Sequence, residues 1–106
     1  MQNAKQELIQ ALTAANKLRT TDVVAFNIEI RDWHDKIIHS CKGTALTTDD
    51  LDLINVLYNS GYGSQQLFGL VLFSDGTWLS REEYDGSEWW IHNVPPTIEY
   101  ILGGGI

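Results

Sequence analysis

The stretch of the chain that decides the fold is residues 67–96, which read LFGLVLFSDGTWLSREEYDGSEWWIHNVPP. Two Asp-Gly pairs, at positions 75–76 and 85–86, separate three runs that are rich in aromatic and branched apolar residues. Asp-Gly between such runs is a strong hairpin signal, because glycine accepts the positive φ of a tight turn. The pattern therefore predicts an antiparallel meander of three strands. These strands are expected over residues 67–73, 77–83 and 87–94.

The chain upstream of the meander begins with a predicted helix and a predicted strand. Residues 4–18 place apolar side chains at helical spacing, and Asn3 is a suitable N-cap for this helix. Residues 23–32 alternate between apolar and polar side chains, which is typical of a strand with one buried face. The apolar positions of that strand are Val24, Phe26, Ile28 and Ile30.

A second helix is predicted to begin at Thr47 or Thr48, because three aspartates follow a hydroxyl N-cap in its first turn. We expect residues 59–61 to end it. Its expected apolar stripe is Leu53, Ile54, Leu57 and Tyr58. Residues 33–41 fit either a turn followed by a short strand or a helical turn. The final segment, residues 97–102, is expected to pack back on the body before a flexible tail at residues 103–106.

These elements predict one α+β domain over residues 1–106, with two helices packed on a mainly antiparallel sheet that ends in a three-stranded meander. Hydrophobic residues make up 43% of the 106, which is sufficient for a packed core. The single cysteine, Cys41, excludes an internal disulfide and fits a reducing compartment. Neither a membrane-spanning run of roughly 18–20 apolar residues nor a secretory signal is present, so we expect a cytoplasmic protein without membrane contact.

The net charge is −7 at pH 7. It disfavours direct nucleic-acid binding, because affinity for phosphate backbones depends on clustered Lys and Arg. The aspartates at the helix start and in the two turns have local structural explanations. Glu82, Glu83 and Glu88 have none, and they surround Trp89 and Trp90.

Candidate catalytic and metal-binding patterns are weak. His34, His39 and Cys41 lie within eight residues, but their spacing matches no structural zinc pattern. The aspartates at 49, 50 and 52 lack the glycine and closing glutamate of a calcium loop. The second hairpin carries several carboxylates, and glycosidases use a pair of carboxylates for catalysis. A chain this small is not expected to form the deep pocket of a glycosidase, so we do not expect this activity. We therefore expect no metal, no cofactor, no catalytic residue and no enzymatic activity.

The second hairpin carries the candidate binding residues. Consecutive strand residues point to opposite faces, so Trp89 and Trp90 cannot both be buried unless both faces of the sheet are covered. Trp and Tyr are enriched among residues that dominate binding energy. The candidate contact residues are Trp78, Glu83, Tyr84, Glu88, Trp89 and Trp90.

The segment from residue 62 to residue 96 resembles a recurring C-terminal segment of small uncharacterised proteins encoded by tailed bacteriophages and prophages. The likeness rests on the strings GYGSQ at 61–65, LFG at 67–69, DGTWLSR at 75–81 and EYDGSEWW at 83–90, and on the two prolines at 95–96. It covers about a third of the chain, and the family brings no established activity. The resemblance implies a phage or prophage accessory protein that binds host machinery.

The leading hypothesis is a non-catalytic acidic protein that binds a host protein with a basic surface, such as a nucleic-acid-handling or defence component. The alternative is a small-molecule or nucleotide-binding module with a pocket between the sheet and the second helix, lined by Tyr58, Tyr62 and Trp78. The chain is expected to be a monomer or a homodimer, the latter through a border strand at residues 23–31 or 67–73.

Overall fold

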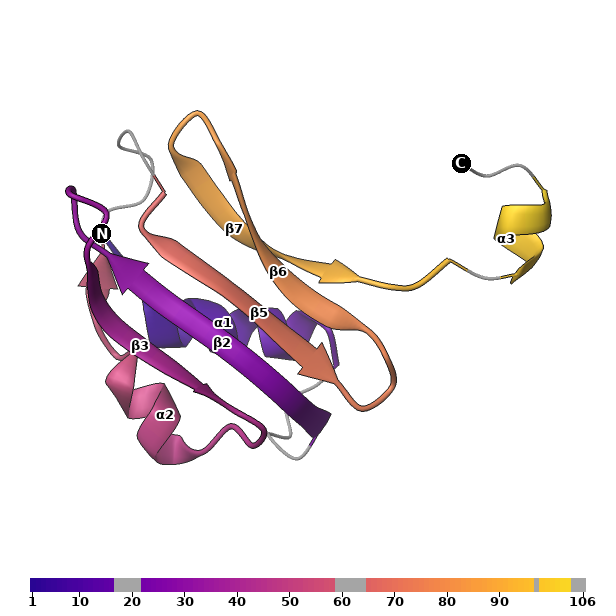
Figure 1. The fold of residues 1–106 in the computed structure, drawn as a ribbon, viewed down its shortest axis with the longest axis horizontal. Coiled ribbons are helices and arrows are strands. Elements are labelled where there is room, and N and C mark those ends of the chain that lie inside the picture. The colour runs from indigo at the N-terminus through magenta and orange to yellow at the C-terminus, as the bar shows by residue number, and fades with distance from the viewer. Residues whose placement is uncertain (17–21, 59–64, 97, 104–106) are drawn as a thin grey trace.

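The computed structural model describes residues 1–16, 22–58, 65–96 and 98–103 (Figure 1). The predicted α+β fold is confirmed: two helices pack on a mainly antiparallel sheet that ends in a three-stranded meander. The elements in chain order are β1 (Gln2–Asn3), α1 (Ala4–Ala14), β2 (Val23–Arg31), β3 (Ile37–Gly43), α2 (Thr48–Leu53), β4 (Leu57–Tyr58), β5 (Leu67–Phe73), β6 (Trp78–Tyr84), β7 (Ser87–Asn93) and α3 (Ile98–Leu102). None of the described helices is long and apolar enough to cross a membrane.

The main sheet has five antiparallel strands in the order β3-β2-β5-β6-β7, and β1 pairs with β4 in a separate two-stranded sheet. The border strands are therefore β3 and β7. The expectation that residues 23–31 or 67–73 form the border is wrong, because β2 and β5 pair with each other along almost their whole length and each has a second partner. Any edge-to-edge association would have to use β3 or β7 instead.

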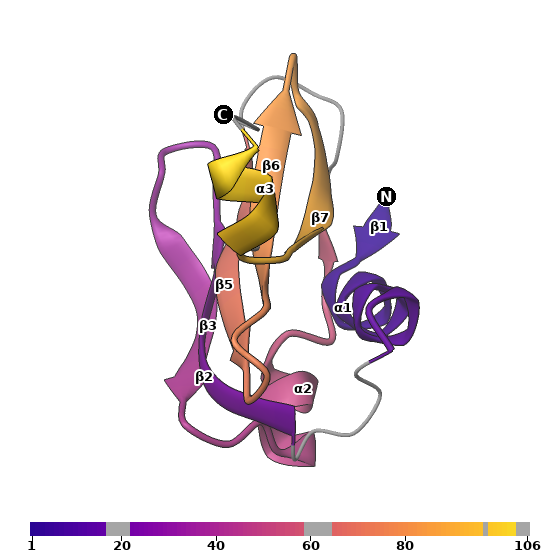
Figure 2. The same ribbon diagram turned by 90° about the vertical axis from the view of Figure 1, so that its right-hand side faces the viewer.

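The two faces of the sheet have different environments. α1 lies against one face, here called the covered face, and α2 packs beside β3 (Figures 1 and 2). The opposite face, here called the open face, has no described element over it and is turned toward the viewer in Figure 1. The core lies between α1 and the covered face. Its largest fully buried side chains are Leu8, Ile28, Ile30, Ile54, Leu67, Val71, Phe73 and Leu79.

The buried face of β2 differs from the prediction at one end. Phe26, Ile28 and Ile30 are buried as expected, but Val24 is 40% exposed and Val23 is buried in its place. The pairing of β2 with β5 shifts register between Val23 and Ala25. An irregularity of this kind inserts a residue and reverses the alternation beyond it, so a strict period of two fails here.

The second helix begins as predicted and ends earlier. The Thr47 hydroxyl accepts a hydrogen bond from the Asp50 N–H at 3.2 Å, and the Asp50 carboxylate accepts one from the Thr47 N–H at 2.9 Å. This capping box starts α2. The predicted continuation through Leu57 and Tyr58 is wrong, because these residues pair with Gln2–Asn3 as β4. The expected stop at residues 59–61 lies outside the described residues.

Residues 33–41 form a turn and then a strand, so the strand alternative is correct. The Asp32 carboxylate organises the turn by accepting hydrogen bonds from the N–H groups of Lys36, at 3.0 Å, and His34, at 2.8 Å. These two bonds lower the pKa of Asp32, because they favour its charged form. Asp35 completes the turn with a φ of 62°.

The last helix does not pack back on the body as predicted. α3 stands apart from the sheet, beyond the end of β7 (Figure 1). Ile98 is 76% exposed, Ile101 50% and Leu102 82%. Of the expected flexible tail, residues 104–106 lie outside the described residues.

Candidate functional site

The pairing of β6 with β7 divides the six predicted contact residues between the two faces of the sheet. Trp90 pairs with Arg81, and Trp89 pairs with Glu82. The Arg81 side chain is buried toward α1, so Trp90 lies on the covered face and Trp89 on the open face. By the same alternation, Trp78, Tyr84 and Trp89 share the open face, whereas Glu83, Glu88 and Trp90 share the covered side.

The open-face side chains of β6 and β7 form an exposed aromatic strip. We call it the hairpin face and define it as Trp78, Glu82, Tyr84, Trp89 and Ile91. Tyr84 is 77% exposed and Trp89 is 41% exposed, while Trp78 and Ile91 are half-buried. Glu82 is exposed and lies opposite Trp89 in the register, so the two side chains are cross-strand neighbours.

The apolar strip continues onto β5. Leu72 pairs with Trp78, and Leu70 pairs with Ser80, which places both leucines on the open face. Leu70 is 58% exposed and Leu72 is 41% exposed. The sequence pattern does not distinguish these leucines, because residues 67–73 are apolar at almost every position. Polar and apolar residues do not alternate in this strand, so the sequence does not show which of its two faces meets solvent.

Trp90 is a packing residue of the covered face. A Cβ atom built on Gly69 would lie 2.6 Å from Cη2 of Trp90, so the ring occupies space that only glycine leaves open. The Arg81 guanidinium lies 5.4 Å from the centre of the Trp90 ring, within cation–π range. The Trp90 Nε1 atom is buried and has no hydrogen-bond partner among the described residues. Trp89, not Trp90, is therefore the exposed member of the pair.

Glu88 is also buried, and the expectation that it belongs to an acidic surface is wrong. Its side chain is 0% exposed, and Arg81 donates to its Oε1 atom from Nη2 at 3.0 Å. The N–H groups of Gln66 and Leu67 donate to the same carboxylate at 2.9 and 3.0 Å. β5 and β6 pair only over Leu70–Leu72. Before this paired stretch, the Glu88 carboxylate provides the hydrogen-bond acceptors that a neighbouring strand would otherwise provide.

The charge network extends from Glu88 to the N-terminal helix. The buried Arg81 donates from Nη1 to Oε2 of Glu7 at 3.0 Å. The Tyr58 hydroxyl donates to Glu7 and accepts from Arg81. Burial raises the pKa of Tyr58, and the hydrogen bond to Glu7 raises it further. The network thereby connects α1, β4, β6 and β7 in the interior.

The described residues do not bring the expected lining of a pocket between the sheet and the second helix together. Tyr58 belongs to the buried network on the covered side, whereas Trp78 lies on the open face, so the sheet separates the two rings. Tyr62, the third expected lining residue, lies outside the described residues. Tyr58 and Trp78 therefore do not line one pocket.

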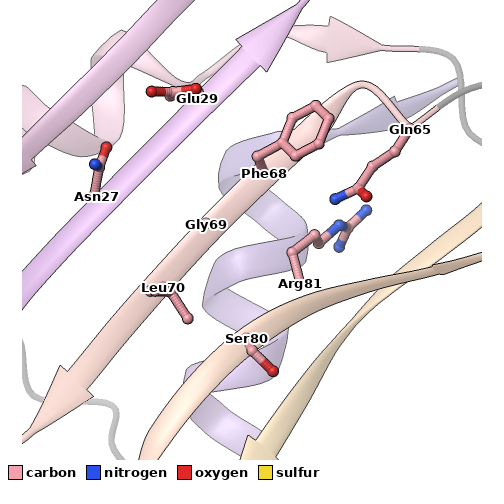
Figure 3. Close-up of a pocket in the computed structure, with 8 residues that line it drawn as sticks. All are labelled: Asn27, Glu29, Gln65, Phe68, Gly69, Leu70, Ser80 and Arg81. Carbon is pink, nitrogen blue, oxygen red and sulfur yellow. The ribbon is translucent and has the colours of Figure 1, made fainter.

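A shallow hollow of about 360 Å³ lies on the open face where β5 and β6 diverge (Figure 3). Glu29 and Phe68 border it on one side, and Ser80 and Arg81 border it on the other. The Arg81 charge is already paired with Glu7 and Glu88, so an anionic ligand would gain little from it.

The residues considered for metal binding are dispersed. His34 and His39 are exposed, whereas Cys41 is buried in the core. Within the described ranges, no group of three or more His, Cys, Asp and Glu side chains is arranged to hold a metal ion. Burial raises the pKa of the Cys41 thiol to about 11, which makes the thiol a packed side chain of low reactivity near neutral pH.

Comparisons of the chain with models of protein families, with curated proteins and with solved structures found no match.

Proposed function

We propose that this chain is a non-catalytic binding protein that captures a partner protein through the hairpin face. The observation that carries the proposal is the exposure of Trp89 and Tyr84 on a face that no described element covers. Large exposed aromatic rings on a rigid strand pair can be buried by a partner at little entropic cost, which is the usual property of binding hot spots.

Charge indicates the kind of partner. The chain carries a net charge of −7, and the exposed Glu82 is a cross-strand neighbour of Trp89. A basic partner surface would be attracted to this region, and salt would weaken the attraction by screening it. With the phage-like sequence segment, these features support a host protein as the partner, with a nucleic-acid-handling or defence component as the class that best fits a basic surface.

The test is a capture experiment from bacterial host lysate at low and high salt. Trp89→Ala is expected to weaken retention of the partner about 30-fold, since removing a central Trp costs about 2 kcal/mol or more. The matched control is Trp33→Ala, because Trp33 is 62% exposed in the β2–β3 turn, outside the hairpin face. Circular dichroism verifies that both variants are folded.

The proposal predicts that the two tryptophan variants behave differently. Equal retention by Trp89→Ala and wild type, or an equal loss in both variants, would rule out the hairpin face as the contact surface. A complex that strengthens with salt would contradict the electrostatic part of the proposal.

A further inference from the structure

The C-terminal arm, here residues 94–96 together with α3, leaves the sheet at the end of β7 and carries an apolar stripe. Ile98, Ile101 and Leu102 follow the i, i+3, i+4 spacing that places side chains on one side of a helix. All three are at least half exposed. A five-residue helix has no independent stability in water, because helix nucleation is unfavourable and so few hydrogen bonds form. The helix therefore requires a surface that buries this apolar stripe.

The open face offers such a surface between β2 and β5. An apolar hollow of about 270 Å³ is lined by Ala25, Phe26, Asn27, Leu70 and Leu72. No charged side chain lines it, and its two leucines are the exposed ones of β5. An aliphatic stripe of the size of Ile and Leu side chains is the matching occupant. This apolar hollow is distinct from the hairpin face, which β6 and β7 provide.

The direction of the arm indicates whether it can enter the hollow of its own chain or must enter that of a second copy of the chain. Pro95 and Pro96 fix the backbone φ angles and supply no N–H, so the segment after Asn93 is extended and joins no sheet. In Figure 1 this segment continues past the end of β7 and holds α3 away from β5 of its own chain. Within the described part of one chain, the apolar hollow and the apolar stripe are thus separated, and neither is covered.

We propose that the arm of one copy docks its Ile98–Ile101–Leu102 stripe into the apolar hollow of a second copy, and that the second copy returns the same contact. Exchange of identical elements across a two-fold axis uses each contact twice and closes the assembly as a dimer. The proposal goes beyond the proposed function, because it concerns β2, β5 and α3 and leaves Trp89 available to another partner.

The like charge of the two copies gives this dimer a recognisable salt dependence. Each copy carries −7, so repulsion between copies falls as salt screens it, while the contact itself is apolar. Dimerisation should therefore be unchanged or stronger at high salt. Binding of a basic partner to the hairpin face should instead weaken.

The experiment is light scattering after gel filtration of the full chain over a range of concentrations. Wild type is expected to have the mass of two chains, 2 × 12.0 kDa. Leu102→Asp in the arm and Leu70→Asp in the hollow should each raise the dissociation constant of the dimer by about tenfold or more. The matched control is Leu53→Asp, because Leu53 is 54% exposed at the end of α2 and Leu70 is 58% exposed.

Mixing the two variants distinguishes arm exchange from any other dimer. A Leu102→Asp copy retains an intact hollow, and a Leu70→Asp copy retains an intact arm, so the mixture restores one of the two contacts. The mixture should dimerise more strongly than either variant alone. A wild type that stays monomeric at millimolar concentration, a dimer that survives both substitutions, or a mixture without recovery would each overturn the proposal.

Discussion

The replacement of Glu88 by alanine tests whether this carboxylate belongs to the interior and not to the acidic surface. In the folded chain its side chain is fully buried and holds the Arg81 guanidinium at 3.0 Å. It also accepts hydrogen bonds from the N–H groups of Gln66 and Leu67. Removing it takes a counter-charge from a buried cation and an acceptor from two backbone donors.

The expected loss follows from these contacts. Breaking a buried ion pair by removing one partner costs about 3–5 kcal/mol, because the remaining charge is left in a poorly solvating interior. Arg81 keeps its ion pair with Glu7, which places the expected loss within that range even though the N–H groups of Gln66 and Leu67 also lose their acceptor. A loss of about 4 kcal/mol lowers the melting temperature of a domain of this size by roughly 15–30 °C. It is a large part of the total stability of about 5–15 kcal/mol that such domains have.

The assay is thermal and urea denaturation, followed by tryptophan fluorescence and circular dichroism. The matched control is Glu82→Ala, since Glu82 is an exposed glutamate of the neighbouring strand β6 and should change stability by no more than about 0.5 kcal/mol. In a double-mutant cycle, Arg81→Met should cost less in the Glu88→Ala background than in wild type. Equal stability of the Glu88→Ala and Glu82→Ala variants would refute the buried network.

Three further predictions concern packing, helix capping and thiol reactivity. Gly69→Ala should destabilise the fold by about 1–3 kcal/mol in urea denaturation, because the new Cβ meets the Trp90 ring at 2.6 Å. Thr47→Ala should cost about 1 kcal/mol in the same assay by removing the N-cap of α2. At pH 8, iodoacetamide should alkylate native Cys41 about 100-fold more slowly than the urea-unfolded chain, because burial raises its thiol pKa to about 11 from 9.0. The same shift should lower the stability as the pH rises from about 9 to about 11, since the unfolded thiol ionises first.

Each of these predictions has a control in the same chain. Gly43→Ala should be nearly neutral, because a Cβ atom at Gly43 would meet Phe26 at an ordinary 3.5 Å. Thr48→Ala should cost less than Thr47→Ala, since Thr48 is the first helical residue and not the cap. A Gly69→Ala variant as stable as Gly43→Ala, an equal effect at the two threonines, or rapid native alkylation of Cys41 would contradict the corresponding interpretation.

Features that depend on neighbours in sequence could be predicted. Gly76 and Gly86 adopt φ values of 86° and 84° in the two hairpin turns, as the Asp-Gly pairs indicate. Asn3 caps α1 by accepting a hydrogen bond from the Gln6 N–H at 3.0 Å, and Thr47 caps α2. The reason is that turns and helix starts are decided by φ preferences and hydrogen bonds within a few residues.

The candidate site could be predicted only in part. The alternation of strand side chains required Trp89 and Trp90 to lie on opposite faces, and they do. Alternation could not say which face α1 covers, because that choice depends on contacts such as Arg81 with Glu7, 74 positions apart in the chain. Consequently Glu88, which shares the face of Trp90, is buried in the core and does not belong to the expected acidic surface.

The sequence by itself therefore determined the strands of the meander, their turns, the helix caps and the splitting of the tryptophan pair, because each has a local cause. The tertiary structure alone decided the order of the strands, the burial of Glu88 and the exposure of Leu70 and Leu72 on the open face. Burial depends on which distant segments meet, and a strand such as β5 that is apolar on both faces carries no local mark of the face left open.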